Sequence, residues 1–445
     1  MAMFAESVAK SIHDRRDGVR SAVGERPLTV LALIATVAQA LGAYRVLSRP
    51  GWPPTRDSRI FEFFGWRIAR GDRLYLDLWE VKPPLSFEMT AILAWLSGGD
   101  VRLFHLLCVL ATSLAAVGVV VLVGAHVLDR TDDAVAAVTA GLAMHFVIAF
   151  HLRSAYGFKA KYFVVLTALA AIWLVRHDRP FAGGVAAAAA VGFWQLAAVV
   201  PVLVLGLAAR RGSKRTVGWV VAGGALGAAL ILAPIVRWGA TRAMIAQVVA
   251  VPLTSVSRGG PTRHLPRFVT LLSASDVPFL AGVVGLGWIG LGRDRAAAWW
   301  AAVGGAWFLA LAVWIDFDLA PDLFPALAFV GIGLGLLVAA VDVRVRRVLV
   351  AWTVAALVIN VAFMGWLGPF GDRAEVTDSP DLADRDAIDA PYNMSERKAL
   401  LWYDVDPTTC HVFVAKTEAT WIDRTGGNLT AETCQEWPIE DLSGG

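Results

Sequence analysis

The chain has 445 residues, of which 57% are apolar and only 17% are charged, and its mean hydropathy is +0.59. This composition excludes an ordinary soluble protein and a disordered chain, and it is typical of a protein with many membrane-spanning helices. We therefore expect a lipid bilayer as its environment. The formal net charge is +3, and we expect no nucleic-acid partner.

Apolar stretches of about 20 residues recur along the chain, each long enough to cross a hydrocarbon layer of roughly 30 Å as a helix. Many are rich in Ala, Gly and Val, which favours close helix contacts. We predict about eleven transmembrane helices; the two around Gln195 are equally compatible with a re-entrant pair. The predicted spans are residues 28–47, 102–127, 134–150, 161–175, 181–194, 196–209, 217–237, 277–292, 296–315, 322–341 and 348–368.

Basic residues predict the orientation of these spans. Arg130, Arg210 and Arg346, with most other arginines between spans, fall on one side if the N-terminus is cytoplasmic, as the positive-inside rule requires. This topology makes 1–27 a cytoplasmic segment and places the C-terminus outside. The sequence therefore predicts a multi-pass protein of the cell membrane.

The first external loop, about 48–101, has a composition unlike its surroundings. From residue 57 it reads DSRIFEFFGWRIARGDRLYLDLWEVKPP. One interpretation is an amphipathic helix at the lipid headgroups, with Phe61, Phe64 and Trp66 in the interface and the arginines in water. That interpretation leaves the acidic residues and the final Lys-Pro-Pro unexplained.

The loop also contains a recognisable set of residues: Asp57-Ser58, Phe61, Gly65, Gly71, Tyr75, Asp77, Trp79, Glu80 and Lys82-Pro83-Pro84. As a set they resemble the first external loop of the C-type (GT-C) glycosyltransferases, which use polyprenyl-phosphate sugars. That superfamily includes protein O-mannosyltransferases, aminoarabinose transferases and archaeal dolichol-phosphate-mannose mannosyltransferases. The resemblance implies an all-α, GT-C-like membrane domain over residues 28–369, with amphipathic helices in the first external loop.

The resemblance also implies roles for two residues. A sugar on a polyprenyl phosphate already has a good leaving group, so the enzyme needs a base for the acceptor hydroxyl and positive charge at the phosphate. Asp57 is the candidate catalytic base; its alternative role is to cap a helix that starts at Ser58. Lys82 is the candidate phosphate partner, stiffened by two prolines before a helix predicted at 85–96. Its alternative is to snorkel to the membrane interface.

Three further residues of the motif are candidates for supporting roles. Asp77 and Glu80 could orient Lys82 or hold a divalent cation, Mg²⁺ or Mn²⁺, although a solvated acidic face explains them equally well. Tyr75 belongs to the same motif. No other cofactor is expected.

Two more external segments carry basic residues against the inside bias. Charge-assisted bonds to a lipid phosphate are a reason to keep them there, and contact with anionic headgroups in general is the alternative. The candidates for binding the donor phosphate are Lys82, Arg153, Lys159, Lys161, Arg258, Arg263, His264 and Arg267.

Beyond the last span, acidic residues greatly outnumber basic ones. Residues 370–391 read as an acidic linker, and 392–445 as a small extracytoplasmic domain of α/β or β-rich structure. Cys410 and Cys434 would form a disulfide under oxidising conditions outside the cell. Zinc bound by these cysteines and His411 would lack a fourth ligand.

Two classes of function fit these observations. A transporter or flippase of a lipid-linked solute should have polar groups near the bilayer midplane, often in repeated halves, whereas here the charge lies in external loops. We therefore predict a transferase. Its resemblance to the archaeal mannosyltransferases implies a dolichyl-phosphate mannose donor, an inverting reaction, and a glycan or glycoprotein acceptor at the terminal step of N-glycan assembly on surface glycoproteins. Another hexose, such as glucose, stays open.

Overall fold

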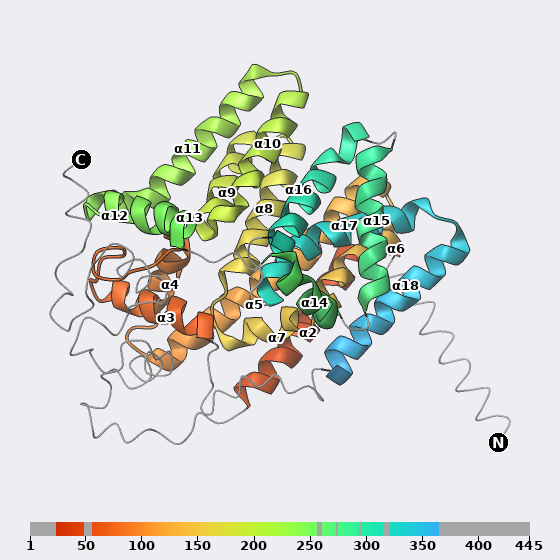
Figure 1. Cartoon of the computed structure of the whole chain (residues 1–445). Coiled ribbons are helices and arrows are strands. Elements are labelled where there is room, and N and C mark those ends of the chain that lie inside the picture. The colour runs from red at the N-terminus through yellow and green to blue at the C-terminus, as the bar shows by residue number, and fades with distance from the viewer. Residues whose placement is uncertain are drawn as a thin grey trace. The chain divides into compact units, whose positions relative to one another are not determined.

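The computed structural model describes residues 24–48, 56–255, 260–272, 275–292, 295–314 and 320–364. The regular elements within these ranges are helices. Leu74 and Leu78 form an isolated β-bridge. The contacts divide the chain into two compact units (Figure 1). Unit 1 contains the described parts of 1–42, 114–152 and 260–368, and unit 2 those of 43–113 and 153–259.

Unit 2 contains the first loop and the helices of the middle of the chain. Its longer helices are α3 (Arg56–Ala69), α4 (Leu85–Leu96), α8 (Ala160–Arg176), α9 (Pro180–Phe193), α10 (Val199–Arg210) and α11 (Lys214–Arg237), together with the start of α5 (Val101–Thr131). Its shorter elements are η2 (Arg153–Tyr156), η3 (Gln195–Ala198), α12 (Thr241–Ile245), the π-helical η4 (Ala246–Ala250) and α13 (Val251–Ser255).

Unit 1 contains most of α2 (Pro27–Leu47), the rest of α5 and the later helices. These are α6 (Ala134–Leu142), η1 (Ala143–Phe146), α7 (Ala149–Leu152), α14 (Pro261–Leu272), α15 (Asp276–Leu291), α16 (Arg295–Trp314), η6 (Ala320–Leu323), α17 (Phe324–Ala340), α18 (Val343–Val358) and the π-helical η7 (Ile359–Met364). Within this unit Asp133 caps α6 and also pairs with Arg346 of α18, at 2.7 Å.

Helical residues occupy each of the eleven ranges predicted as spans. By length and composition, four helical segments can cross a membrane: α2, α5, α11 and residues 320–340. The number rises to six if the bent pairs 134–146 with 149–156 and 264–272 with 276–291 each form one span. The all-helical membrane class is confirmed, but helix length in the described residues supports four to six spans rather than eleven.

The apolar stretch around Gln195 contains a break between two helices. α9 ends at Phe193 because Trp194 adopts an extended conformation, with φ −159° and ψ 118°. A 3₁₀ turn, η3, then leads into α10. The break predicted at Gln195 is therefore present, as one extended residue followed by a 3₁₀ turn.

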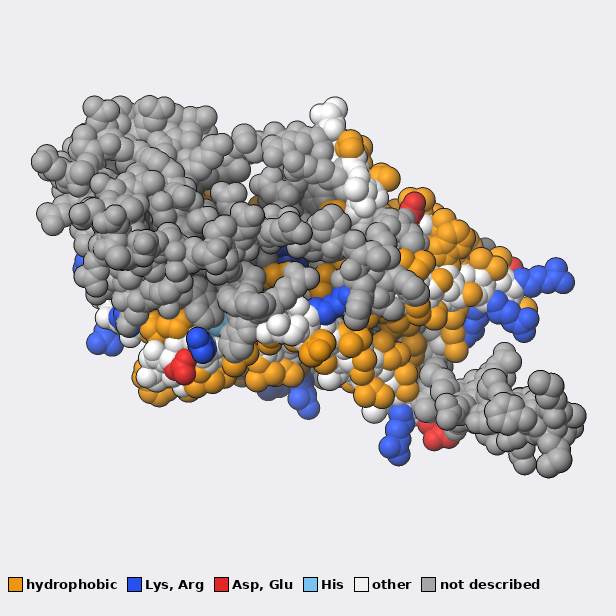
Figure 2. All heavy atoms as spheres, turned by 90° about the horizontal axis from the view of Figure 1, so that it is seen from below, with side chains coloured by type: hydrophobic (Ala, Val, Ile, Leu, Met, Phe, Trp, Pro, Cys, Tyr) orange, Lys and Arg blue, Asp and Glu red, His pale blue; other side chains and the backbone are white. Residues whose placement is uncertain are grey.

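Much of the described surface is apolar, as expected for a protein surrounded by lipid. Leu33, Trp95 and Leu291 are more than half exposed. Apolar side chains cover large areas of the described surface visible in Figure 2, and the basic side chains project in small groups. Such a surface is stable only where lipid, or a similar apolar medium, replaces water.

The first-loop helix α3 is buried within unit 2. Phe61, Phe64 and Trp66 are only 3%, 1% and 4% exposed. The Phe61 ring lies 5.3 Å from that of Phe87 in α4, and Trp66 stacks on Phe104 of α5 at 5.8 Å. The interpretation of these aromatic residues as a headgroup anchor is therefore wrong, because protein rather than lipid covers them.

Glycines allow α9 and α11 to pack closely in the same unit. A Cβ at Gly223 would overlap the carbonyl oxygen of Phe181, and one at Gly184 would overlap that of Val220. Backbones can approach this closely only where side chains are absent, and small residues serve this purpose in membrane helices. α9, α10 and α11 accordingly run beside one another (Figure 1).

Replacing Gly223 by valine should destabilise unit 2, because two helix backbones would have to separate to admit the side chain. We expect a loss of about 1–3 kcal/mol in the free energy of unfolding, as for other overpacked sites. Thermal unfolding of the detergent-purified protein measures it. Gly218→Val is the matched control, since it lies on α11 with no atom within 4 Å of its Cβ position; equal losses from both variants would contradict the packing argument.

Candidate functional site

The turn between α3 and α4, residues 70–84, carries most of the first-loop motif. Tyr75 has a φ of +71°, an unusual conformation for a residue other than glycine, which costs about 1–3 kcal/mol. Its N–H donates to the carbonyl oxygen of Leu78 at 2.8 Å. Strain of this size persists only where surrounding contacts enforce it.

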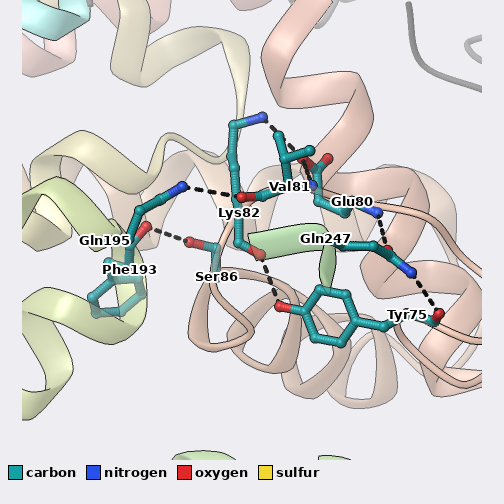
Figure 3. Close-up of polar contacts among 8 residues, drawn as sticks. All are labelled: Tyr75, Glu80, Val81, Lys82, Ser86, Phe193, Gln195 and Gln247. Atoms are coloured by element: carbon teal, nitrogen blue, oxygen red, sulfur yellow. Dashed lines mark hydrogen bonds and ion pairs between the residues drawn. The ribbon is translucent and has the colours of Figure 1, made fainter. Parts of the chain in front are cut away.

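The Tyr75 side chain provides one such contact. Its hydroxyl donates to the backbone oxygen of Lys82 at 2.7 Å and so joins the two ends of the turn (Figure 3). Burial raises the pKa of Tyr75 well above its ordinary value, and the carboxylates of Glu80 and Glu88 raise it further. The hydroxyl therefore keeps its proton and acts as a donor.

Gln247, from the π-helical η4, provides two more contacts. Its Nε2 donates to the carbonyl oxygen of Tyr75 at 2.9 Å, and its Oε1 accepts from the N–H of Glu80 at 3.0 Å (Figure 3). The side chain is 1% exposed, so it replaces water as the partner of both backbone groups. π-Helical turns are frequent at functional sites because they redirect single side chains.

Gln195 holds the far end of the turn. Its Nε2 donates to the carbonyl oxygen of Val81 at 3.1 Å. The sequence analysis noted Gln195 only as a possible break and did not identify Gln247. A glutamine within an apolar stretch was the available signal, because a polar side chain there needs a partner.

Lys82 lies at the end of this constrained turn. Its Nζ is 3.4 Å from Oε1 of Glu80 and 5.5 Å from the ring centre of Phe61, and its side chain is 37% exposed. The same Glu80 oxygen accepts from the N–H of Val81 at 2.9 Å. Glu80 thus pairs with Lys82, and part of the lysine side chain stays accessible.

Asp77 points elsewhere, to Arg73. Its carboxylate accepts two bonds of 2.9 Å from the guanidinium and one of 2.7 Å from the N–H of that residue. Partial burial raises the pKa of Asp77, but the hydrogen bonds and charge of Arg73 outweigh it, so the pKa is lowered. Over the described ranges, the His, Cys, Asp and Glu side chains form no group of three placed to hold a metal ion.

Basic residues at the start of α8 lie near the same turn. The Nζ of Lys161 is 2.9 Å from the ring centre of Trp194, the neighbour of Gln195. Lys159 is buried in the residue before α8. Lys161 thus lies at the break between α9 and η3, where Gln195 also bonds to Val81, the residue before Lys82. Arg153, at the start of η2, is half-buried.

The remaining residues predicted from the sequence lie at the start of α3, in unit 1 or outside the described residues. α3 begins at Arg56, so Asp57 lies inside its first turn rather than just before it. The side chain of Asp57 lies outside the described residues. His264 belongs to unit 1, where its Nδ1 is 3.0 Å from the carbonyl oxygen of Val313. Also outside the described residues are the side chains of Arg263 and Arg267, and all of Arg258, Cys410, Cys434 and the tail.

Part of the chain matches a known protein family. Residues 71–233 match the model of a family described as DolP-mannose mannosyltransferase. Over these residues the chain is similar to that family. The resemblance read from the first-loop motif is confirmed. The family segment includes Lys82, the start of α8 and Gln195, whereas α3 precedes it and Gln247 follows it.

Two similar proteins extend the comparison. The chain is 28% identical to a dolichol phosphate-mannose mannosyltransferase of Haloferax volcanii, over 94% of this chain and 99% of that protein. Its fold is similar to that of ArnT from Cupriavidus metallidurans, solved with undecaprenyl phosphate bound, with a TM-score of 0.53 and 16% identity. That alignment covers 92% of this chain and 73% of ArnT. The fold of this chain is thus similar to that of ArnT.

Glu88 is a further acidic residue near the turn, one that the sequence analysis did not select. It lies in the first turn of α4, a helix of 12 residues and too short to cross a membrane. Its Oε1 is buried and has no hydrogen-bond partner in the described part of the chain. Burial raises the pKa of Glu88 from 4.5 to about 8, so near neutral pH the folded protein holds it mostly as the neutral acid.

Gln247→Met should loosen the motif turn, because methionine fills a similar volume but leaves the Tyr75 carbonyl and the Glu80 N–H unpaired. Each buried group without a partner costs about 1–3 kcal/mol. Hydrogen–deuterium exchange of the peptide covering residues 75–82 should become faster. The control is Gln39→Met, which replaces a buried glutamine of α2. Unchanged exchange in Gln247→Met would contradict the role of Gln247 in holding the turn.

Glu88→Gln should change how stability depends on pH. Because the folded pKa of about 8 exceeds the ordinary 4.5, the contribution of Glu88 is fully present below pH 4.5 and is lost as pH rises toward 8. Melting temperatures of the wild type and the Gln variant, measured from pH 5 to 8.5, should diverge in favour of the variant as pH rises. Parallel curves would show that Glu88 ionises normally.

Proposed function

We propose that this protein is an inverting membrane mannosyltransferase that transfers mannose from dolichyl phosphate to a glycan acceptor outside the cell. The observation that supports this most directly is Lys82, oriented by Glu80 on a clamped turn inside the segment that matches the DolP-mannose mannosyltransferase family. The relative from Haloferax volcanii, named for the same donor, supports mannose and dolichol.

The donor phosphate would bind at Lys82. As the bond between sugar and phosphate breaks, negative charge gathers on the phosphate oxygens, and an ammonium group already in place stabilises that charge. Lys161 and Lys159 are the next candidates in unit 2, because contacts through Trp194 and Phe158 connect them to the turn. Arg153 belongs to the same group. Arg258, Arg263, His264 and Arg267 are the further proposed candidates.

The acceptor hydroxyl would be activated by Asp57. In a single displacement, the hydroxyl oxygen bonds to the anomeric carbon, its proton passes to the Asp57 carboxylate, and the dolichyl phosphate leaves with the bonding electrons. Attack opposite the phosphate inverts the configuration at that carbon. A carboxylate in the first turn of α3 is also favoured by the positive end of the helix dipole.

The proposed enzyme is a multi-pass protein of the cell membrane, its N-terminus cytoplasmic and its first loop outside. The positive-inside distribution of arginine supports this orientation. We assign 370–391 to a linker and 392–445 to an extracytoplasmic domain with a Cys410–Cys434 disulfide. The acceptor would be the N-glycan of a surface glycoprotein at its terminal step.

A test is transfer by the purified protein in detergent, supplied with labelled dolichyl phosphate mannose and a glycan acceptor. We expect turnover, which a transporter or flippase cannot produce without a membrane. Asp57→Asn should lower the rate by about 10²-fold or more, the effect of losing a general base, and should leave the melting temperature unchanged. No transfer by the wild type would refute the proposal, and full activity of the variant would remove Asp57 from it.

A further inference from the structure

Unit 2 contains a buried carboxylate that the motif analysis did not select. Glu62 of α3 is 0% exposed. Its Oε2 is 2.8 Å from Nδ1 of His105 in α5, and its Oε1 accepts from the N–H of Phe158 at 3.0 Å. A buried carboxylate is costly unless both oxygens are paired, so these contacts hold three elements together.

The third of these elements leads into the basic start of α8. Phe158 directly precedes Lys159, and Lys161 follows in the first turn of the helix. The ring of Phe158 also packs edge-on against Phe61, at 5.5 Å. The bond from Glu62 therefore fixes where α8 begins relative to α3.

Gly157 shows how closely this turn packs on α3. It has a φ of +110°, and a Cβ there would overlap Oε1 of Glu62 and lie 3.1 Å from Cβ of Ser58. The absent side chain lets the Phe158 N–H reach the carboxylate. Glu62 and Gly157 thus act as complementary parts of one contact.

Glu62 is unsuited to be the base itself. No surface of it is accessible to an acceptor hydroxyl. Positions 57 and 62 also differ by five residues, which is about 140° around a helix and about 7.5 Å along it. Any effect of Glu62 on the reaction must therefore pass through the position of α3.

We propose that Glu62 is a positioning residue that sets the distance between the Asp57 end of α3 and the basic residues at the start of α8. This inference rests on the proposed function, because it presumes that the base and the phosphate-binding residues act on one donor. Errors of about 1 Å in such an arrangement can cost about 10²-fold in rate.

The role requires the hydrogen-bonding shape of Glu62 but not its charge. A glutamine can accept from the Phe158 N–H through its carbonyl oxygen. It can donate from its amide to Nδ1 of a neutral His105 that carries its proton on Nε2. Leucine fills the space but pairs neither group.

The experiment compares Glu62→Gln, Glu62→Leu and the control Thr112→Val. Thr112 is a buried residue of α5 whose hydroxyl bonds to the Cys108 carbonyl of its own helix. We expect kcat for mannose transfer to fall about 10²-fold in Glu62→Leu, with the donor KM nearly unchanged, and to stay within about threefold of wild type in Glu62→Gln and Thr112→Val. If Glu62→Leu fails to fold, Gly157→Ala, which disturbs the same contact from the other side, should show the kcat loss.

Hydrogen–deuterium exchange of residues 157–161 provides a readout independent of activity. Exchange should rise in Glu62→Leu, or in Gly157→Ala if that variant is used, and not in Glu62→Gln. The wild type could transfer no mannose while exchange is still faster in Glu62→Leu or Gly157→Ala. This result would refute the proposed function but support Glu62 as the anchor of this turn. Equal loss of kcat in the Gln and Leu variants would show that the charge of Glu62, not its hydrogen-bonding shape, is required. That result would overturn the positioning role, as would unchanged exchange.

Discussion

The candidate site depends on hydrogen bonds to the backbone groups of the polar turn between α3 and α4. The turn lies within a largely apolar chain, and its backbone groups cannot rely on water. Gln247 satisfies the Tyr75 carbonyl and the Glu80 N–H, while Gln195 satisfies the Val81 carbonyl. These contacts enforce the strained conformation of Tyr75 and place Lys82 beside Glu80.

The same rule explains the arrangement of α3. A helix with Glu62 among its aromatic residues would be unstable at a lipid surface, because the carboxylate would lack partners. Packing against α4 and α5 covers the aromatic side chains, and His105 and the Phe158 N–H satisfy the carboxylate. Burial of apolar area and pairing of polar atoms therefore favour the same position of the helix.

These contacts suit a reaction that depends on placement. Transfer from a polyprenyl phosphate needs little chemistry from the protein beyond a base and a cation, so the rate depends on holding both at the correct distance. Gln247 holds backbone groups of the motif turn, and His105 holds the Glu62 side chain of α3, although both residues are remote in sequence from their partners. The rigid part of the site is thus assembled from several helices.

The sequence by itself determined the membrane class, the helical content of all eleven ranges, the helix at 85–96 and the resemblance to the mannosyltransferases, because hydropathy, proline position and the first-loop motif are local signals. Only the tertiary structure decided that α3 is buried, that Asp77 pairs with Arg73 while Glu80 pairs with Lys82, and that Gln247 and Glu62 accept from the backbone N–H groups of Glu80 and Phe158. The physical reason is that a buried polar atom takes its partner from whatever lies next to it in space, and in this protein Gln247 and Glu80 are 167 residues apart in the chain.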